Sequence, residues 1–378
     1  MIPYGRQNIN DIDIASVIEI LRSDWLTQGP VVEKFECALA GYVGATCAVG
    51  ASNATAALHL ACRALNLGPG DLLWTSPNTF LASANCALYC GASVDFVDID
   101  PNTYNMCPIA LAEKLKNAEK IGQLPKIIIP VHFAGQSCDM KQIAALAKKY
   151  SCAVIEDASH AIGADYENTK VGSCLYSDIT VFSFHPVKII TTGEGGMTTT
   201  NNENLAEKMR YLRSHGMTRN ANHMTKPSEG AWYYQQIDLG YNYRLTDIQS
   251  ALGLTQLTRI EAFIKRRRYL AHRYHQILAD LPITLPLYHQ LNKSSWHLYP
   301  IQVNERKKIF DLLRKNNIGV NVHYIPVHTQ PHYQAMGFKI GDFPNAEFYY
   351  SQAISLPMYF DLSDEDQDKV ITVIKEGL

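Results

Sequence analysis

The sequence has no strong excess of charge of either sign and no long apolar run, and each absence excludes a class of protein. Its 34 Lys and Arg residues nearly balance 36 Asp and Glu residues, which gives a formal net charge of −2 over 378 residues. A balanced charge argues against a protein held to nucleic acid or to a membrane surface by bulk electrostatics. No apolar run approaches the roughly 18 residues that a membrane helix needs, so we predict no membrane segment.

The cysteines do not form a disulfide or metal pattern. All nine lie between Cys37 and Cys174, their number is odd, and no CxxC pair occurs, which does not suit an oxidised framework. Cys86 and Cys90 are one helical turn apart and could share a metal, but small buried residues in an apolar helix are the better interpretation. The sequence lacks HExxH, so we predict no metal site. Residues 1–7 contain no hydrophobic signal segment, and we expect a cytoplasmic protein.

The chain contains enough apolar residues for a large core. Hydrophobic residues make up 47% of the sequence and charged residues 19%, which excludes a disordered or fibrous protein. The length suggests either two or three units of roughly 150 residues each or one large α/β domain with an attachment.

Short apolar, β-branched runs alternate with helical patterns through the first two-thirds of the chain. Such runs are typical of parallel strands covered by helices on both faces, and their alternation predicts a doubly wound α/β layer. Functional residues should then gather in loops at the carboxyl ends of the strands. The expected strands are 47–50, 72–75, 94–97, 127–131, 153–156, 180–183 and 196–199, and the expected helices are 54–65, 80–90, 109–115, 140–149 and 203–214.

The pattern changes in the last third of the chain. Residues 244–281 are rich in Leu, Gln, Arg and Ala and contain no glycine after Gly253, which predicts one long helix, straight or kinked, that leaves the main domain. Beyond Pro282 the expected elements are the strands 296–303 and 319–324 and the helices 307–316, 345–355 and 363–376. We therefore predict a large domain over 1–255 and a smaller α+β domain over 256–378.

Lys188 is the first residue with a chemical signature. An apolar strand runs into Ser183, and the lysine and a glycine-rich segment at 193–196 follow. Lys188 stands between Val187 and Ile189, and an amine in an apolar pocket has a lowered pKa and can form a Schiff base. A solvated surface lysine is the competing interpretation, and the flanking sequence must decide between the two.

Two further segments suit a phosphorylated pyridine-type cofactor. An apolar strand ends in Glu156 and Asp157, and a carboxylate at that place could hold a protonated ring nitrogen; capping of the next turn or magnesium binding is the alternative. Residues 50–58 follow a strand and open a helix with small residues and hydroxyls, which suits phosphate binding as well as ordinary helix capping. Neither a Walker loop nor a GxGxxG fingerprint occurs.

Six motifs, in order along essentially the full length, resemble the DegT/DnrJ/EryC1/StrS family of sugar aminotransferases that depend on pyridoxal 5′-phosphate (PLP). Each motif alone is moderately specific, and the six in order are highly specific. They are LTQGP at 26–30, SNATAAL at 52–58, EDASHA at 156–161, FSFHPVK at 182–188, GEGG at 193–196 and GYNYRL at 240–245. The resemblance implies the fold type I of PLP-dependent transferases, aspartate-aminotransferase-like, with a mostly parallel sheet and a smaller C-terminal domain.

The resemblance also implies a role for individual residues. Lys188 would be the Schiff-base lysine, Asp157 the partner of the pyridine nitrogen, and His160 a catalytic neighbour of the cofactor's phenolic oxygen. The other implied cofactor contacts are Ala54, Thr55 and Ser183 at the phosphate, Phe80 against the ring, and Asn242 at the phosphate of the neighbouring subunit's cofactor. The residues implied to line a nucleotide-sugar pocket are Tyr4, Leu26, Thr27, Gln28, Gly29, His323 and Tyr324.

The implied reaction is transfer of an amino group from L-glutamate to C4 of a UDP-linked 4-keto-6-deoxy-N-acetylhexosamine, in pseudaminic acid biosynthesis. A different nucleotide 4-ketosugar, such as a UDP-4-keto-pentose, and a catalytically inactive binding or regulatory relative are the alternatives. Some relatives have a histidine in place of the lysine and remove a hydroxyl, so Lys188 favours transamination. A homodimer with shared active sites is implied, without nucleic acid, membrane or metal as partners.

Overall fold

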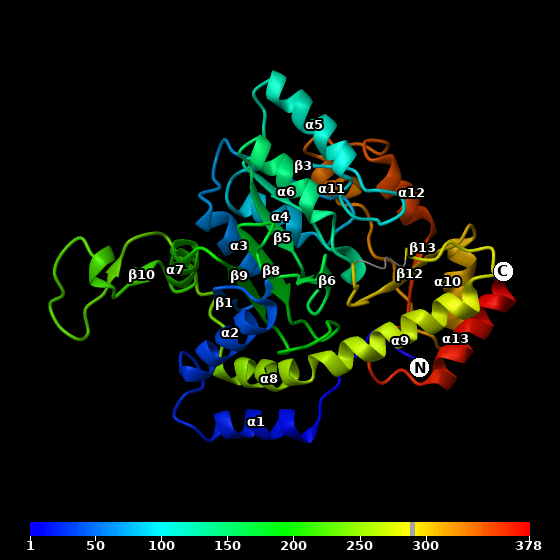
Figure 1. Cartoon of the computed structure of the whole chain (residues 1–378), viewed down its shortest axis with the longest axis horizontal. Coiled ribbons are helices and arrows are strands. Elements are labelled where there is room, and N and C mark those ends of the chain that lie inside the picture. The colour runs from blue at the N-terminus through cyan, green and yellow to red at the C-terminus, as the bar shows by residue number, and fades with distance from the viewer. Residues whose placement is uncertain (288–291) are drawn as a thin grey trace.

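A seven-stranded sheet forms the centre of the computed structural model, which describes residues 1–287 and 292–378 (Figure 1). The strand order is β1-β9-β8-β5-β4-β2-β3. Strand β9 is antiparallel to β1 and β8, whereas the other neighbouring pairs are parallel. The strands are β1 (Cys47–Ala51), β2 (Leu72–Thr75), β3 (Ser93–Phe96), β4 (Ile127–Ile129), β5 (Ala153–Asp157), β8 (Ile179–Ser183) and β9 (Gly196–Thr200). The mostly parallel α/β sheet is confirmed, and each predicted strand in this region matches an observed one.

Helices cover both faces of this sheet because the strands are apolar on both faces. Ile127 and Ile129 pack in one buried cluster with α3, α4 and α7, and Ile128 between them packs in another with α5 and α6. Leu73 and Trp74 divide in the same way, as expected for side chains that alternate along a strand. The helices are α2 (Pro30–Val43), α3 (Ala54–Ala64), α4 (Ala82–Tyr89), α5 (Pro108–Lys120), α6 (Met140–Lys149) and α7 (Glu203–Leu212).

The expected helix at 80–90 begins later than its apolar pattern indicated. Helix α4 starts at Ala82, and Phe80 belongs to the loop before it. The Thr79 and Ser83 hydroxyls lie 2.8 Å apart across this start, so polar side chains of the loop close the first turn. Phe80 is consequently free to face the cavity described below.

The expected long helix is two helices with a kink between them. Helix α8 (Asp247–Thr258) ends just before Arg259, and α9 (Ile260–Leu278) begins just after it. Arg259 itself has a φ of −102° and a ψ of 3°, which depart from helical values. The Arg259 guanidinium binds the N-terminal segment, donating to Asn8 Oδ1 over 2.6 Å and pairing with the buried Asp13. Asp13 lies on α1 (Asp11–Leu21), which packs along α8.

A smaller cluster of buried side chains surrounds the antiparallel pair β12 (Tyr299–Gln302) and β13 (Ala353–Leu356). Helices α9, α10 (Arg306–Lys315) and α13 (Asp364–Gly377) cover it. The cluster also contains Ile2, because the N-terminus runs beside residues 317–319. The remaining short elements are β6 (Asp165–Tyr166), β7 (Thr169–Lys170), β10 (Met217–Thr218), β11 (Gln235–Gln236), α11 (Pro331–Gln334), α12 (Pro344–Gln352) and three 3-10 turns, η1 (Phe133–Gly135), η2 (Ala221–His223) and η3 (Val327–Thr329).

Two predictions for this part of the chain were wrong. Residues 319–324 do not form a strand; Asn321 makes only an isolated bridge to Ser355. The helix expected over 345–355 ends at Gln352, and the next four residues form β13. Their alternation of small and apolar residues fits a buried strand beside β12, and that pairing is a long-range contact that a local pattern does not contain.

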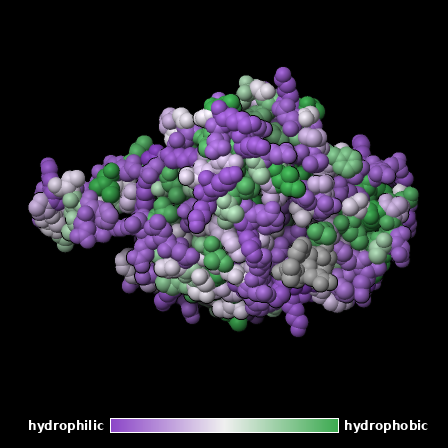
Figure 2. Space-filling view, turned by 45° about the horizontal axis from the view of Figure 1, so that its top comes forward, coloured by the Kyte–Doolittle hydropathy of each residue, from purple (hydrophilic) through white to green (hydrophobic). Residues whose placement is uncertain are grey.

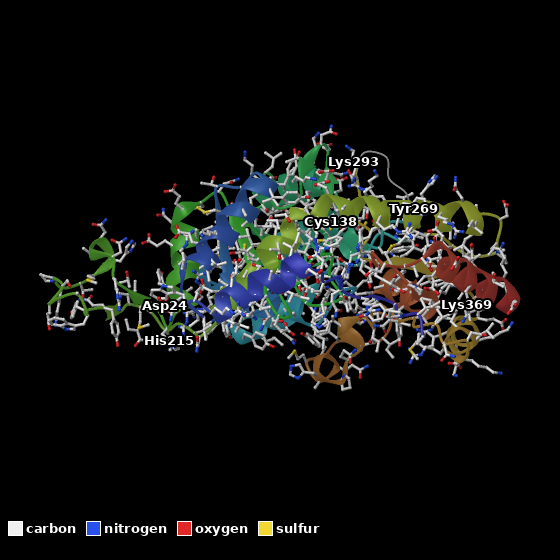
Figure 3. The ribbon with its side chains drawn as sticks, turned by 90° about the horizontal axis from the view of Figure 1, so that it is seen from below. Asp24, Cys138, His215, Tyr269, Lys293 and Lys369 are labelled. Carbon is white, nitrogen blue, oxygen red and sulfur yellow. The ribbon has the colours of Figure 1, made fainter. Side chains whose placement is uncertain are left out.

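A slender arm projects from the body and carries the β10–β11 hairpin (Figure 1). The space-filling view shows the arm as a narrow extension at the left, and apolar patches scattered among polar residues over the body (Figure 2). His215 lies at the base of the arm, whereas Tyr269 and Lys369 lie on α9 and α13 at the opposite end (Figure 3). None of the helices in the described residues is long and apolar enough to span a bilayer.

Candidate active site

A cavity of about 830 Å³ opens where the loops after the central strands meet the segment 321–324. This is the edge at which the sheet topology places ligands. It brings together residues that lie far apart in the sequence. Of those predicted, the cavity is lined by Tyr4, Ala54, Thr55, Phe80, Asp157, His160, Ser183, Lys188, His323 and Tyr324.

The other predicted residues lie outside this cavity. Leu26 is exposed and Thr27 forms a bridge with Thr246. Asn242 is exposed on a loop. Gln28 and Gly29 line a separate pocket of about 590 Å³.

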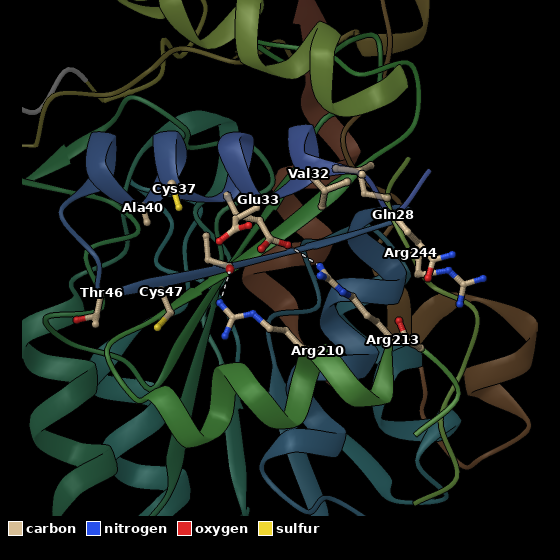
Figure 4. Close-up of a pocket in the computed structure, with 15 residues that line it drawn as sticks. Gln28, Val32, Glu33, Cys37, Ala40, Thr46, Cys47, Arg210, Arg213 and Arg244 are labelled. Atoms are coloured by element: carbon tan, nitrogen blue, oxygen red, sulfur yellow. Dashed lines mark hydrogen bonds and ion pairs between the residues drawn. The ribbon is translucent and has the colours of Figure 1, made fainter. Parts of the chain in front are cut away.

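Both arginines and glutamates line that second pocket. Figure 4 shows Arg210 and Arg213 reaching from the end of α7 toward α2, with Arg244 and Gln28 on the same side as Arg213. Arg213 pairs with Glu36 at 2.5 Å and also donates to the carbonyl of Gly50. These bonds hold α2, β1 and α7 together, which is a structural role.

Lys188 lies in the loop that connects β8 to β9. Its backbone N–H donates to the carbonyl of His185, and the loop continues into the buried Ile189 and Ile190. Burial lowers the pKa of Lys188 to about 8, and the opposing charge of Asp157 limits the decrease. The structure thus agrees with the prediction of an amine whose pKa is lowered, because removal from water disfavours its charged form.

Asp157 ends strand β5 and is almost completely buried. The hydroxyl of Ser83, from α4, donates to Oδ2 over 2.6 Å, and that of Ser159 donates to Oδ1 over 2.6 Å. The side chain of Glu156 is bonded elsewhere, to His132 and Ser177. Two hydroxyls therefore fix the carboxylate of Asp157, whereas its neighbour in the motif has a structural role.

The N-terminus of α3 forms a cradle for an anion. Asn53 has extended φ and ψ and caps the helix by accepting a hydrogen bond from the N–H of Ala56 over 2.8 Å. The amides of Ala54 and Thr55 thus stand at the positive end of the helix dipole. Gly196 makes room for this turn, since a Cβ at that position would lie 2.5 Å from the carbonyl of Asn53. Ser183 adds a hydroxyl from the end of β8.

Together these groups fit a phosphorylated pyridine. The cavity offers a buried carboxylate for a ring nitrogen, an amine with a lowered pKa for an aldehyde, and a helix N-terminus for a phosphate. Phe80 provides an aromatic face that is 59% exposed toward open space. In the described residues, no group of three or more His, Cys, Asp or Glu side chains is arranged to hold a metal ion. Fold and site together define a PLP-dependent enzyme of fold type I.

Comparison with known proteins gives the family. A model of the DegT/DnrJ/EryC1/StrS aminotransferase family matches residues 7–375, and this chain belongs to that family. It is 43% identical to the spore coat polysaccharide biosynthesis protein SpsC of Bacillus subtilis, over 99% of this chain and 96% of that protein. The enzyme is accordingly a PLP-dependent sugar aminotransferase.

Solved structures agree over the whole chain. Spr1654 of Streptococcus pneumoniae, assigned as a sugar aminotransferase, superposes in its PMP form with a TM-score of 0.92 at 32% identity, with complete coverage of both chains. PseC of Helicobacter pylori, an aminotransferase involved in the biosynthesis of pseudoaminic acid, gives 0.91 at 34% identity, over 100% of this chain and 98% of that one. The Streptococcus protein was solved in PLP and PMP forms, and PLP is the cofactor of this enzyme.

Several residues of the site were missed from the sequence. Ser159 could have been found, because it stands inside the motif that contains Asp157. Ser83 and Thr79 had no signal, since a serine or threonine near a helix start is normally a capping residue. Asn53, Glu194 and Tyr243 also line the cavity and stand inside recognised motifs, whereas His59, His297, Asn321 and Val322 line it without a sequence signal.

Cofactor attachment to the apoprotein should depend on pH through Lys188. Only the neutral amine attacks an aldehyde, and a pKa of about 8 leaves about one-tenth of the lysine neutral at pH 7. We expect the rate of PLP attachment, followed by near-visible absorbance, to rise with pH and level off above about 8. In Asp157→Asn the midpoint should move to lower pH, because the charge that raises the pKa of Lys188 is removed. A midpoint near that of free lysine would contradict the burial argument.

Proposed function

We propose that this enzyme moves an amino group from L-glutamate to C4 of a UDP-linked 4-keto-6-deoxy-N-acetylhexosamine. The observation that carries the proposal is the complete set of Lys188, Asp157 and the α3 cradle in one cavity. The full-length likeness to PseC, whose product pathway is that of pseudoaminic acid, supports the choice of sugar. Because the lysine is present, transfer of an amine is favoured over removal of a hydroxyl.

The chain's own residues have distinct tasks in this reaction. PLP, when bound, supplies an electron sink for charge that develops on the reacting carbon. The carboxylate of Asp157, fixed by Ser83 and Ser159, holds a proton on the ring nitrogen. Nζ of Lys188 would move the proton from Cα of the amino donor to the cofactor in one half-reaction, and from the cofactor to C4 of the sugar in the other. A nucleotide on the sugar supplies binding energy remote from C4 that orients it toward Lys188.

A different acceptor sugar is the main alternative. SpsC, at 43% identity, belongs to spore coat polysaccharide biosynthesis, so a relative with higher identity than the 34% of PseC has a different biological setting. The alternative acceptor is another nucleotide 4-ketosugar, such as a UDP-4-keto-pentose, and the second alternative is a catalytically inactive binding or regulatory relative. The intact lysine and carboxylate speak against the last of these.

Product analysis with a panel of UDP-4-ketosugars and glutamate tests the proposal. We expect the 4-keto-6-deoxy-N-acetylhexosamine to be aminated at C4 with the highest kcat/KM, as measured by mass spectrometry and NMR of the product. Preference for the keto-pentose would select the alternative sugar. A protein that binds PLP and aminates none of the panel would contradict the assignment.

We also propose that the enzyme is a homodimer in which each subunit completes the other's site. The surface of α1 supports this, because Ile12, Ile14, Ile18 and Leu21 are all exposed and its single buried residue is Asp13. Apolar residues gathered on one exposed helix suit burial against a second copy. In the described residues the cavity contains no arginine, although an anionic substrate needs cationic partners.

Subunit exchange tests the shared site. Lys188→Ala protein mixed with Asn242→Ala protein should regain activity, because some mixed dimers contain one site with both native residues. The increase should exceed the activity of either parent incubated alone for the same time. If Asn242 only caps a turn in its own chain, every site stays defective and mixing restores nothing. Light scattering that showed a fully active monomer would also end the proposal.

A further inference from the structure

Both ring nitrogens of His160 are engaged inside the protein. The backbone N–H of Ala134 donates to Nδ1 over 3.3 Å, and Nε2 lies 3.0 Å from the phenolic oxygen of Tyr324. Burial lowers the pKa of His160 well below its ordinary value, and the charges of Lys188 and His323 act in the same direction. The ring is therefore neutral with a single proton. Because Nδ1 accepts, that proton lies on Nε2 and is donated to Tyr324.

The loop after β4 fixes this arrangement. Ala134 has a φ of 57°, a left-handed conformation that is unfavourable for residues other than glycine and here turns its N–H toward His160. Gly135 follows with a φ of 97°, where a Cβ would lie 2.5 Å from the hydroxyl of Ser295. That hydroxyl donates to the carbonyl of His160 over 3.0 Å. Two loops, distant in sequence, thus hold the histidine through its ring and its backbone.

His297 packs against the imidazole of His160. Its ring centroid is 4.4 Å from that of His160, and its Nδ1 is buried without a hydrogen-bond partner among the described residues. Burial lowers the pKa of His297 well below its ordinary value, so it adds no charge beside His160. The imidazole of His160 has little room to rotate away from Tyr324.

The phenolic oxygen of Tyr324 accepts a hydrogen bond from Nε2–H of His160, so its own O–H is left to donate to a second acceptor. Within residues 1–287 and 292–378 its phenolic oxygen has no other partner. Burial raises the pKa of Tyr324, and the charges of Asp157 and Tyr4 add to the increase, so the phenol stays protonated at physiological pH. The Tyr324 side chain lines the same cavity as Lys188.

We propose that Tyr324 is the hydrogen-bond donor that this cavity presents to a ligand oxygen beside Lys188, and that His160 acts on the ligand through Tyr324. His160 is then a positioning residue. The acceptor is either a ring oxygen of the cofactor or the keto oxygen of the sugar, and both accept an O–H in the same way. Only the choice between these two rests on the proposed function.

Tyr324→Phe removes the hydroxyl and keeps the ring, so it separates the two acceptors. If the cofactor oxygen is the acceptor, the pH midpoint of the holoenzyme's near-visible absorbance should move by about one pH unit. If the sugar oxygen is the acceptor, that midpoint stays fixed, the half-reaction with glutamate is unchanged, and kcat/KM for the ketosugar falls about 10- to 100-fold. Either result supports the proposal.

The tautomer of His160 can be measured without turnover. In apoprotein labelled with ¹⁵N-histidine, we expect NMR to show an unprotonated Nδ1 and a protonated Nε2 for His160, assigned by loss of the signals in His160→Gln. In Tyr324→Phe the Nε2 resonance should shift. A proton on Nδ1 would overturn the proposal, whatever the enzyme's substrate proves to be. This measurement on the native protein also applies if the tyrosine variant fails to fold.

Tyr349→Phe is the matched control. Tyr349 is buried outside the cavity and its hydroxyl has no hydrogen-bond partner in the described chain, so its loss should leave absorbance titration and kinetics unchanged. Equal behaviour of the two phenylalanine variants would refute a role for Tyr324. A large loss in His160→Gln with none in Tyr324→Phe would show that His160 contacts the ligand directly, and would likewise refute it.

Discussion

Replacing Lys188 by alanine should abolish amino-group transfer while the fold is retained. The lysine lies in a loop. In the described residues its amine makes no hydrogen bond or ion pair that joins secondary-structure elements. Its loss should therefore leave the core unchanged. Burial lowers the pKa of this lysine to about 8, so the folded state disfavours its charged form. Removing the amine should therefore stabilise the fold by a small amount at pH values below 8. We expect no product above background by chromatography, with an unchanged circular dichroism spectrum.

Lys188→Arg sharpens the test. Arginine keeps a positive charge, but its guanidinium is not deprotonated near neutral pH, so it can neither attach the cofactor nor shuttle a proton. Lys170→Ala is the matched control, since Lys170 pairs with Asp165 at 3.2 Å and does not line the cavity. We expect the arginine variant to be inactive and the control to be active. More than a trace of turnover in either Lys188 variant would remove this residue from the chemistry.

Asp157→Asn should fold and bind PLP but lose most of its activity. Ser159 donates through both its N–H and its hydroxyl to Oδ1, so an amide oxygen can take that place. The amide NH₂ then faces Ser83, whose hydroxyl can turn and donate to Thr79, 2.8 Å away. What is lost is the negative charge beside the ring nitrogen. We expect kcat to fall on the order of a thousandfold or more, equivalent to about 4 kcal/mol of transition-state stabilisation.

The spectrum of bound cofactor and the thermal midpoint should accompany this measurement. Unchanged thermal stability would place the loss in the chemistry and not in the fold. Asp165→Asn is a suitable control, because Asp165 is paired with Lys170 and lies away from the cavity. Activity of Asp157→Asn within tenfold of the parent would mean that another residue holds the ring nitrogen.

The sequence by itself determined the sheet and predicted that Lys188 and Asp157 lie at its ligand edge. Strands such as β4 and β5 are short apolar runs whose burial follows from composition, and their alternation with helices leaves few topologies. Asp157 ends β5 and Lys188 lies in the loop that follows β8, so their placement at the ligand edge follows from the strand pattern alone. The break between α8 and α9 was not located in this way, because Arg259 there binds Asn8 and Asp13, which lie about 250 residues earlier in the chain.

Only the tertiary structure decided which side chains share the cavity. Tyr324 meets His160 across 164 residues of sequence, and Ser83 reaches Asp157 across 74, although neither contact leaves a periodic signal. In a single chain, Gln28 and Gly29 instead line a pocket beside Arg213. The physical reason is that periodicity reports which face of an element is buried, whereas the partner on that face is set by the packing of the whole chain.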